Sequence, residues 1–218
     1  MNAATTKTLT FDEFLEWKPE NGHYELHEGI IIKMQPTGKH EEIVEFLQTE
    51  LTLEARKKEY PFRFPKNVLI KALNGESGYL PDVLVMQRNA MENEPLWEAS
   101  STLTRGESIP LVIEVVSRNW RDDYLTKLRD YELLGIQEYW IVDYFGYGGV
   151  RYLGSPKQPT ISVYILVDGE YHLRQFRDHD VIQSQVFPEL NLTAQQIFKA
   201  NLLNIFPQEA SLHGCGFG

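Results

Sequence analysis

The segment Leu111–Val116 constrains the fold of this chain more than any other, because it places a carboxylate inside an apolar run. Its sequence, LVIEVV, has β-branched residues on both sides of Glu114 and is typical of an interior strand covered on both faces. Side chains alternate along a strand, so Glu114 shares a face with Val112 and Val116. A buried carboxylate without a partner is very costly in free energy. Glu114 therefore requires either an internal ion pair with a lysine or arginine, or a bound metal ion.

A second acidic residue, Asp82, follows Pro81 at the start of a predicted strand. Proline cannot donate to a sheet ladder, so Asp82 lies at or just inside the beginning of that strand. By itself, this position suits a turn or capping aspartate. Beside Glu114 on a neighbouring strand, it suggests a metal site, because two carboxylates about 4 Å apart repel by roughly 4 kcal/mol at an effective dielectric constant of about 20. Mg²⁺ removes this repulsion and typically takes one or two protein carboxylates, with water and substrate phosphates at its other positions.

Lys127 belongs to a predicted helix over 120–134 that ends at Gly135. Asp123, Lys127 and Tyr131 recur at intervals of one helical turn, so they form a single stripe along this helix. The stripe borders the packed side of the helix, where a lysine can reach a scissile phosphate or the attacking water. The alternative is an ordinary surface pair between Asp123 and Lys127.

Hydrophobic periodicity predicts a mixed arrangement of helices and strands. Amphipathic or capped segments predict helices over 11–17, 39–58, 120–134 and 194–200. Short segments rich in β-branched and aromatic residues predict strands over 24–27, 30–34, 68–73, 83–86, 111–116, 138–143, 150–153, 161–167 and 171–176, with another near 181. The expected fold is therefore α/β (α+β), with a mixed central β-sheet flanked by helices.

The character of the chain changes at Gly146, after which short predicted strands are joined by turns. Asp168-Gly169 is a strong hairpin signal. We expect a single domain over 1–218, made of an α/β core over 10–145, a β-hairpin extension over 146–190, and a short helix with a loose tail over 191–218.

The net negative charge of the chain argues against binding of nucleic acid by general electrostatic attraction. The chain carries 21 basic and 31 acidic residues, a net charge of −10 with neutral histidines. A local basic patch can still lie on an acidic body. The segment Arg56–Lys71 holds six basic residues and one acidic residue, Glu59. This segment is either a solvated helix end and loop or a phosphate-binding surface.

Compartment signals are few. Apolar runs are far shorter than the ~20 residues of a membrane span, and the N-terminal sequence lacks the basic and apolar regions of a secretion signal. The single cysteine, Cys215, rules out an intrachain disulfide. These features predict a cytoplasmic location with no membrane partner. His213 and Cys215 in the tail make a poor metal site.

The candidate residues resemble the motif pattern of the PD-(D/E)XK nuclease superfamily. The resemblance rests on Pro81-Asp82 and on Glu114-Val115-Val116-Ser117, followed by Asp123, Lys127, Tyr131 and the segment from Gly135 to Asp143. Upstream, Tyr24-Glu25-Leu26 with Gly29 matches as well, and so does His40 at the start of the long helix. In this order and spacing, over about residues 10–190, the chain is similar to a large bacterial family of putative restriction endonucleases.

This resemblance implies a restriction-endonuclease-like fold over the core and Mg²⁺-dependent hydrolysis of DNA phosphodiester bonds, with Mn²⁺ as a substitute. Asp82 and Glu114 would be the metal ligands. Lys127 would be the catalytic lysine, which helps to deprotonate the attacking water or stabilises charge on the phosphate. Glu25 and His40 would line the same cleft. Glu25 would hold a water or a second cation, and His40 would orient a carboxylate or contact phosphate, with a structural hydrogen bond as the alternative for each.

One departure from the superfamily pattern leaves other functional classes open. The superfamily lysine usually lies two positions after the acidic residue, where this chain has Val116, so Lys127 would have to replace it. The alternative is a catalytically weak or inactive protein on the same scaffold that binds nucleic acid or assembles into homo-oligomers. A metal-free hydrolase with two carboxylates as acid and base is a third possibility. With the nuclease function we expect a homodimer, since cleavage of both DNA strands needs two active sites.

Overall fold

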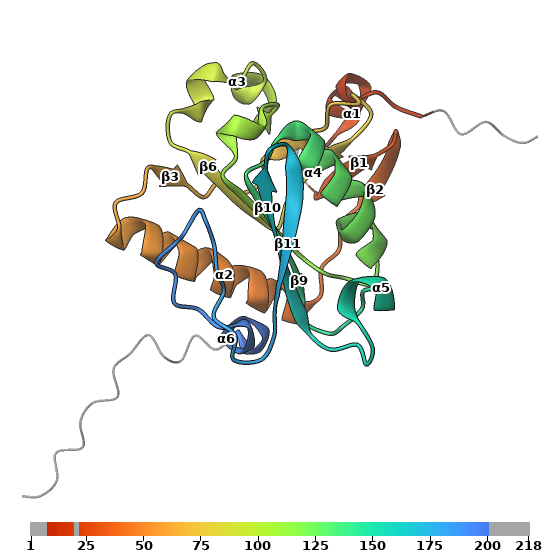
Figure 1. The fold of residues 1–218 in the computed structure, drawn as a ribbon. Coiled ribbons are helices and arrows are strands. Elements are labelled where there is room, and N and C mark those ends of the chain that lie inside the picture. Colours follow the sequence, from red (N-terminus) through yellow and green to blue (C-terminus); the bar gives the residue numbers. More distant parts are fainter. Residues whose placement is uncertain (1–7, 20–21, 201–218) are drawn as a thin grey trace, which may run out of the picture.

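A mixed β-sheet forms the centre of the fold (Figure 1). Within residues 8–19 and 22–200, which the computed structural model describes, this sheet has six strands in the order β11-β10-β9-β8-β6-β3. β8 and β9 run parallel, and the other neighbours are antiparallel. The predicted mixed central sheet is thereby confirmed. Its strands are β3 (Phe62–Arg63), β6 (Val83–Gln87), β8 (Leu111–Val115), β9 (Glu138–Asp143), β10 (Thr160–Val167) and β11 (Glu170–Phe176).

A second, smaller sheet is not expected from the sequence. In the described part of the chain it has five strands in the order β2-β1-β5-β4-β7. Two of them have only two residues each, which is too short for an alternating pattern to be read. The strands are β1 (Tyr24–His27), β2 (Ile30–Lys33), β4 (Leu69–Lys71), β5 (Gly78–Tyr79) and β7 (Thr102–Leu103).

Helices flank the sheets, as the fold class predicts. The α-helices are α1 (Phe11–Trp17), α2 (Gly38–Lys57), α3 (Trp97–Ser100), α4 (Leu128–Leu134), α5 (Val150–Leu153) and α6 (Ala194–Lys199). Short 3₁₀ turns occupy Ala90–Asn93 and Gly106–Ser108, and a π-helical segment, Asp122–Lys127, leads directly into α4. The helix predicted over 120–134 is thus π-helical in its first part, and it ends, as expected, at Gly135 with φ 85°.

The two faces of β8 belong to different apolar cores. Leu111, Ile113 and Val115 pack with α2, whereas Val112 and Val116 pack in a second core with Tyr131 of α4. Figure 1 shows α2 and α4 on opposite sides of this sheet. The alternation predicted for the LVIEVV run is therefore present, and Glu114 lies on the α4 side.

The segment 150–153 is a helix, and its prediction as a strand is wrong. Gly149 precedes the helix, and Gly154 ends it with φ 80°. Leu153 is buried in the same core as Tyr124. Four residues are too few for periodicity to distinguish a helix from a strand, so tertiary packing decides the conformation.

The β10–β11 hairpin extends the central sheet. β10 pairs with β9 along the strand from Thr160 to Ile165, and Asp168-Gly169 forms the two-residue turn with both φ angles positive. Val181 forms an isolated bridge with Thr193. The predicted tail after residue 200, including His213 and Cys215, lies outside the described residues. In the described ranges no helix combines the length and apolarity needed to cross a membrane.

Gly106 offers a test of how tightly the loop before β8 packs against the end of α4. A Cβ atom here would lie 2.6 Å from the Gly135 carbonyl carbon and nearer still to the Leu134 carbonyl oxygen. Because backbone cannot move aside as a side chain does, we expect Gly106→Ala to lower the free energy of unfolding by about 1–3 kcal/mol in urea titrations. Gly38→Ala is the matched control, since nothing lies within 4 Å of its added Cβ. Equal stability of the two variants would contradict this packing.

Candidate active site

The predicted site residues converge where the two sheets meet. A cavity of about 360 Å³ is lined by, among others, His40, Asp82, Glu114, Asp123 and Lys127. They come from the first turn of α2, the residue before β6, β8, and the π-helical segment before α4. Glu25, from β1 of the smaller sheet, is fully buried behind Lys127 and does not line the cavity. Five positions far apart in the sequence thus form one cluster.

Lys127 is the centre of this cluster. Its ammonium nitrogen lies 3.0 Å from Glu25 Oε1, 3.1 Å from Glu114 Oε1 and 3.8 Å from Asp123 Oδ1. Only 2 % of the residue is exposed, so it is not the surface pair that the helix pattern allows as an alternative. Burial lowers the pKa of Lys127, but the surrounding carboxylates outweigh burial and raise the pKa well above its usual range. Lys127 is therefore a permanent cation at neutral pH.

The π-helical segment and α4 each direct one side chain at Glu114. Lys127 ends the segment, and Tyr131, one turn later in α4, donates its hydroxyl to Glu114 Oε1 at 2.9 Å. The predicted Asp123, Lys127 and Tyr131 stripe therefore faces the core. π-helical turns are uncommon, and they frequently occur at functional sites.

Glu25 is held on both carboxylate oxygens. Oε1 accepts from the Leu80 backbone N–H at 2.8 Å as well as from Lys127, and Oε2 lies 2.6 Å from His27 Nε2. Burial raises the pKa of Glu25, but Lys127 and His27 outweigh burial and lower it below the usual value. Glu25 is the ionised partner of the buried lysine, so the structure places it as a support for Lys127.

Asp82 does not act only as a turn residue, because its carboxylate contacts two other elements. Its Oδ2 accepts from the Val115 backbone N–H at 2.7 Å and lies 3.1 Å from His40 Nε2. Burial lowers the pKa of His40, but the hydrogen bond and charge of Asp82, with help from Glu41, raise it above its usual value. His40 thus orients Asp82, one of the two roles that the resemblance implies for it.

Negative charge is in excess around the cavity. Burial raises the pKa of Glu114; Lys127 lowers it, but Asp82 and two further carboxylates raise it again, to well above the usual range. Burial likewise raises the pKa of Asp123, to about 7, despite Lys127. Four carboxylates therefore share one lysine and two histidines, His27 and His40, among the described residues of this cluster, so the site favours an additional positive charge.

The residues fit a divalent cation at Asp82 and Glu114. Each uses one carboxylate oxygen, Asp82 Oδ2 and Glu114 Oε1, in the contacts described above. The other oxygen of each has no hydrogen-bond partner among the described residues, and both side chains line the cavity. Across the described ranges, no group of three or more His, Cys, Asp or Glu side chains is arranged to hold a metal ion. A cation here would use two protein carboxylates and water, which suits Mg²⁺.

Two contributors were missed at the level of sequence. His27, which contacts Glu25, lies two residues after it on β1 and hence on the same face of the strand, a signal that alternation contains. Tyr79 places its ring under Lys127, 5.7 Å from the ammonium nitrogen. It comes from a two-residue strand, and no local pattern marks it.

The raised pKa of Asp123 predicts a specific pH dependence. The native state keeps the Asp123 proton up to about pH 7, whereas the unfolded chain loses it near the ordinary value of 3.8. The contribution of protonated Asp123 to folding stability is thus complete below pH 3.8 and is lost as pH rises through 7. We measure the free energy of unfolding by urea titration without divalent cations, and we expect the wild-type value to fall as pH rises from about 5 to about 7. In Asp123→Asn we expect this fall to be smaller by about 1–2 kcal/mol, because the group that titrates is absent. Asp178→Asn, on an exposed turn, should follow the wild-type curve; the same curve for Asp123→Asn would refute the assignment.

Comparison with known proteins shows the fold and the family of the chain. A crystal structure of a putative nuclease belonging to DUF820 from Anabaena variabilis matches with a TM-score of 0.66 and 22% identity, over 88% of this chain and 98% of that chain. This match shows the fold. No curated protein matches the sequence. Residues 11–195 match the Uma2 family, described as putative restriction endonuclease, and the chain therefore belongs to this family.

Proposed function

We propose that the protein is a Mg²⁺-dependent endonuclease that hydrolyses DNA phosphodiester bonds. The observation that carries the proposal is the convergence of Asp82, Glu114 and the Lys127 ammonium on one cavity. Membership of a restriction-endonuclease family favours DNA as the substrate. The homodimer expected from the sequence stays a prediction.

In this proposal Asp82 and Glu114 hold the cation. When bound, Mg²⁺ supplies Lewis-acid polarisation of the scissile phosphate and lowers the pKa of water. The protein's own contribution is to fix both carboxylates. Asp82 is held by Val115 N–H and His40, and Glu114 is held by Tyr131 and Lys127. This preorganisation avoids rearrangement when charge develops on the phosphate.

Lys127 then stabilises charge on the phosphate and does not take a proton from water. A general base needs a neutral amine, and the raised pKa keeps Lys127 protonated. Glu25 holds the ammonium in place as a positioning residue, and His40 does the same for Asp82.

The superfamily's lysine is not needed at position 116, where this chain has valine. Its side chain is fully buried in the apolar core on the α4 side of the sheet. The Lys127 ammonium reaches Glu114 from the adjoining π-helical segment at 3.1 Å. A lysine from another element would therefore act at the same acidic residue.

A second candidate function rests on the same ion pair. Lys127 already neutralises part of the charge of Glu25 and Glu114. A catalytically inactive module that binds nucleic acid or assembles into oligomers would need the same neutralisation, because it would hold no metal ion. Calorimetry with Mn²⁺ separates the two. Micromolar binding that is lost in Glu114→Ala favours the enzyme, and absence of binding favours the module.

Removing either proposed metal ligand should abolish cleavage. We expect Asp82→Asn and Glu114→Gln to slow Mg²⁺-dependent nicking of supercoiled plasmid by about 100-fold or more, since the metal's charge stabilisation amounts to several kcal/mol. Glu94→Gln is the control. Glu94 is a buried carboxylate that accepts from Thr104 N–H away from the cavity, so its loss should leave cleavage intact. Full activity of Asp82→Asn would sink the proposal.

A pair of Lys127 variants separates stability from catalysis. Lys127→Met should cost about 3–5 kcal/mol of folding stability, because Glu25 is left buried without its counter-ion. Adding Glu25→Gln should restore much of that stability, since both members of the pair are then neutral. Cleavage should remain lost in the stable double variant, measured on the same plasmid. Cleavage that returns together with stability would mean that Lys127 is structural only.

A further inference from the structure

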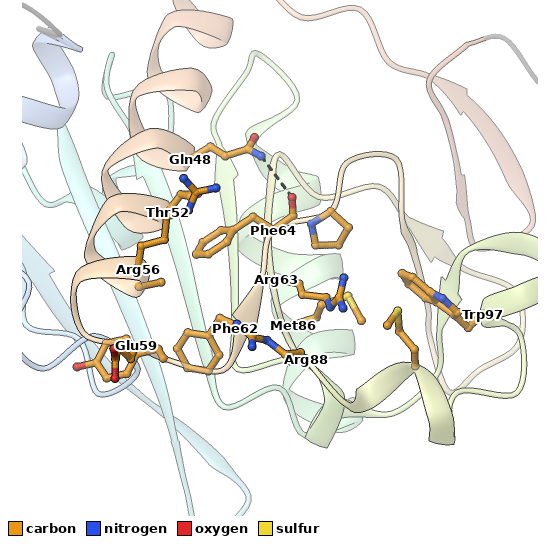
Figure 2. A pocket seen from close by; sticks show the side chains of 14 residues that line it. Gln48, Thr52, Arg56, Glu59, Phe62, Arg63, Phe64, Met86, Arg88 and Trp97 are labelled. Carbon is orange, nitrogen blue, oxygen red and sulfur yellow. Dashed lines mark hydrogen bonds between the residues drawn. The ribbon is translucent and has the colours of Figure 1, made fainter.

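A second cavity, of about 870 Å³, lies beside the candidate active site and has no part in the chemistry proposed above. It is bounded by the C-terminal half of α2, by β3 and the residues after it, by the end of β6, and by the segment that carries Met91 and Trp97 (Figure 2). Its volume is within the range of sites that bind small organic groups.

Three arginines line this cavity. Arg56 comes from α2, Arg63 from β3 and Arg88 from just after β6, and all three are exposed. None has a carboxylate within ion-pairing distance in the described part of the chain. Three lysines of the neighbouring segment differ, since Lys57, Lys58 and Lys71 pair with Glu54, Glu189 and Asp12, whereas Lys66 has no such partner among the described residues and lines the other cavity. Unpaired guanidinium groups in a hollow suit phosphate, which they bind in a bidentate manner.

Aromatic rings also line the cavity, together with one carboxylate, Glu59. Phe62, Phe64 and Trp97 are each only partly buried. Figure 2 shows Arg63 between Phe64 on one side and Trp97 on the other. Arginines and aromatic rings in one cavity are a combination by which proteins bind unpaired nucleotides, because phosphates contact the cations and bases stack on the rings.

The cavity adjoins the candidate active site. Gln48 and Pro65 line both cavities, and Gln48 donates to the Phe64 carbonyl oxygen across their shared wall. Lys66, next to Pro65, lines the active-site cavity. A chain of phosphates leaving the catalytic cluster would pass Lys66 and reach the arginines.

We propose that this second cavity is a subsite for an unpaired segment of the DNA strand that flanks the scissile phosphate. The assignment rests on the proposed nuclease function for its position relative to cleavage, and on cation and ring placement for its chemistry. A closed duplex hides its base faces, so the rings select unpaired nucleotides. The substrate is therefore DNA with a single-stranded tail, a flap or a locally opened duplex.

Fluorescence anisotropy without divalent cation tests this proposal directly, because binding is then measured in the absence of Mg²⁺-dependent cleavage. The probes are fluorescein-labelled DNA hairpins with a 5′ tail, with a 3′ tail or with a blunt end. We expect Arg63→Gln combined with Arg88→Gln to weaken binding of at least one tailed hairpin about tenfold and to reduce its salt slope by about 1.4, with little change for the blunt hairpin. Trp97→Leu should weaken the same probe about tenfold through lost stacking, with an unchanged salt slope.

The matched control removes the same charge elsewhere. Arg151 and Arg174 are exposed and lie outside both cavities, so Arg151→Gln combined with Arg174→Gln should leave tailed-hairpin binding within about twofold of the wild type. Equal losses in the two double variants, no binding of any tailed hairpin, or tighter binding of an RNA tail of the same sequence would each overturn the subsite.

Failure of the subsite and failure of the nuclease function give different results. Cleavage lost in Asp82→Asn, together with unchanged tail binding in the Arg63 and Arg88 variant, would retain the nuclease and reject the subsite. Metal-independent cleavage, together with tail binding that the arginine substitutions abolish, would reject the proposed mechanism and retain the subsite.

Discussion

The buried ammonium of Lys127 organises the site, because no position inside a protein tolerates such a charge alone. Glu25 and Glu114 contact it at 3.0 and 3.1 Å and come from different sheets. The lysine can therefore be satisfied only when the smaller sheet, β8 and the π-helical segment are all in place. Desolvating these groups is costly, and the contacts between Lys127 and its carboxylates offset that cost.

The same arrangement explains why the cluster is suited to a cation. Glu25 is fully engaged by Lys127, His27 and a backbone N–H, whereas Asp82 and Glu114 line the cavity and each has one oxygen without a hydrogen-bond partner among the described residues. The supporting carboxylate and the two candidate ligands are thus distinguished by their hydrogen bonds. Excess negative charge raises the pKa of Glu114 and Asp123, which is the electrostatic condition that a bound Mg²⁺ would relieve.

The overall charge of the chain is a poor guide to this surface. A net charge of −10 argues against binding DNA through the whole body. Folding nevertheless pairs Lys57, Lys58 and Lys71 with carboxylates and leaves Arg56 and Arg63 without such partners among the described residues, and it brings Arg88 from another element beside these arginines. Since electrostatic fields act locally, an arginine-lined hollow can bind phosphate on an acidic protein.

The sequence by itself determined most of the elements, the mixed central sheet and the identity of the clustered residues. The elements, the sheet and the importance of Glu114 depend on local features: β-branched runs, helical periodicity, and a carboxylate that an apolar strand cannot leave unpaired. Glu25 and His40 joined the candidate residues only through the resemblance to the nuclease family. The two-residue strands of the second sheet, the helix at 150–153 and the support that Tyr79 gives the cluster were not predictable, whereas the position of His27 beside Glu25 is contained in the strand alternation but was missed. Only the tertiary structure decided that Lys127 is buried and not part of a surface pair, and that Glu25 is its counter-ion and not a cavity residue. The reason is physical: burial and charge pairing depend on which distant segments pack together, and no local pattern contains that information.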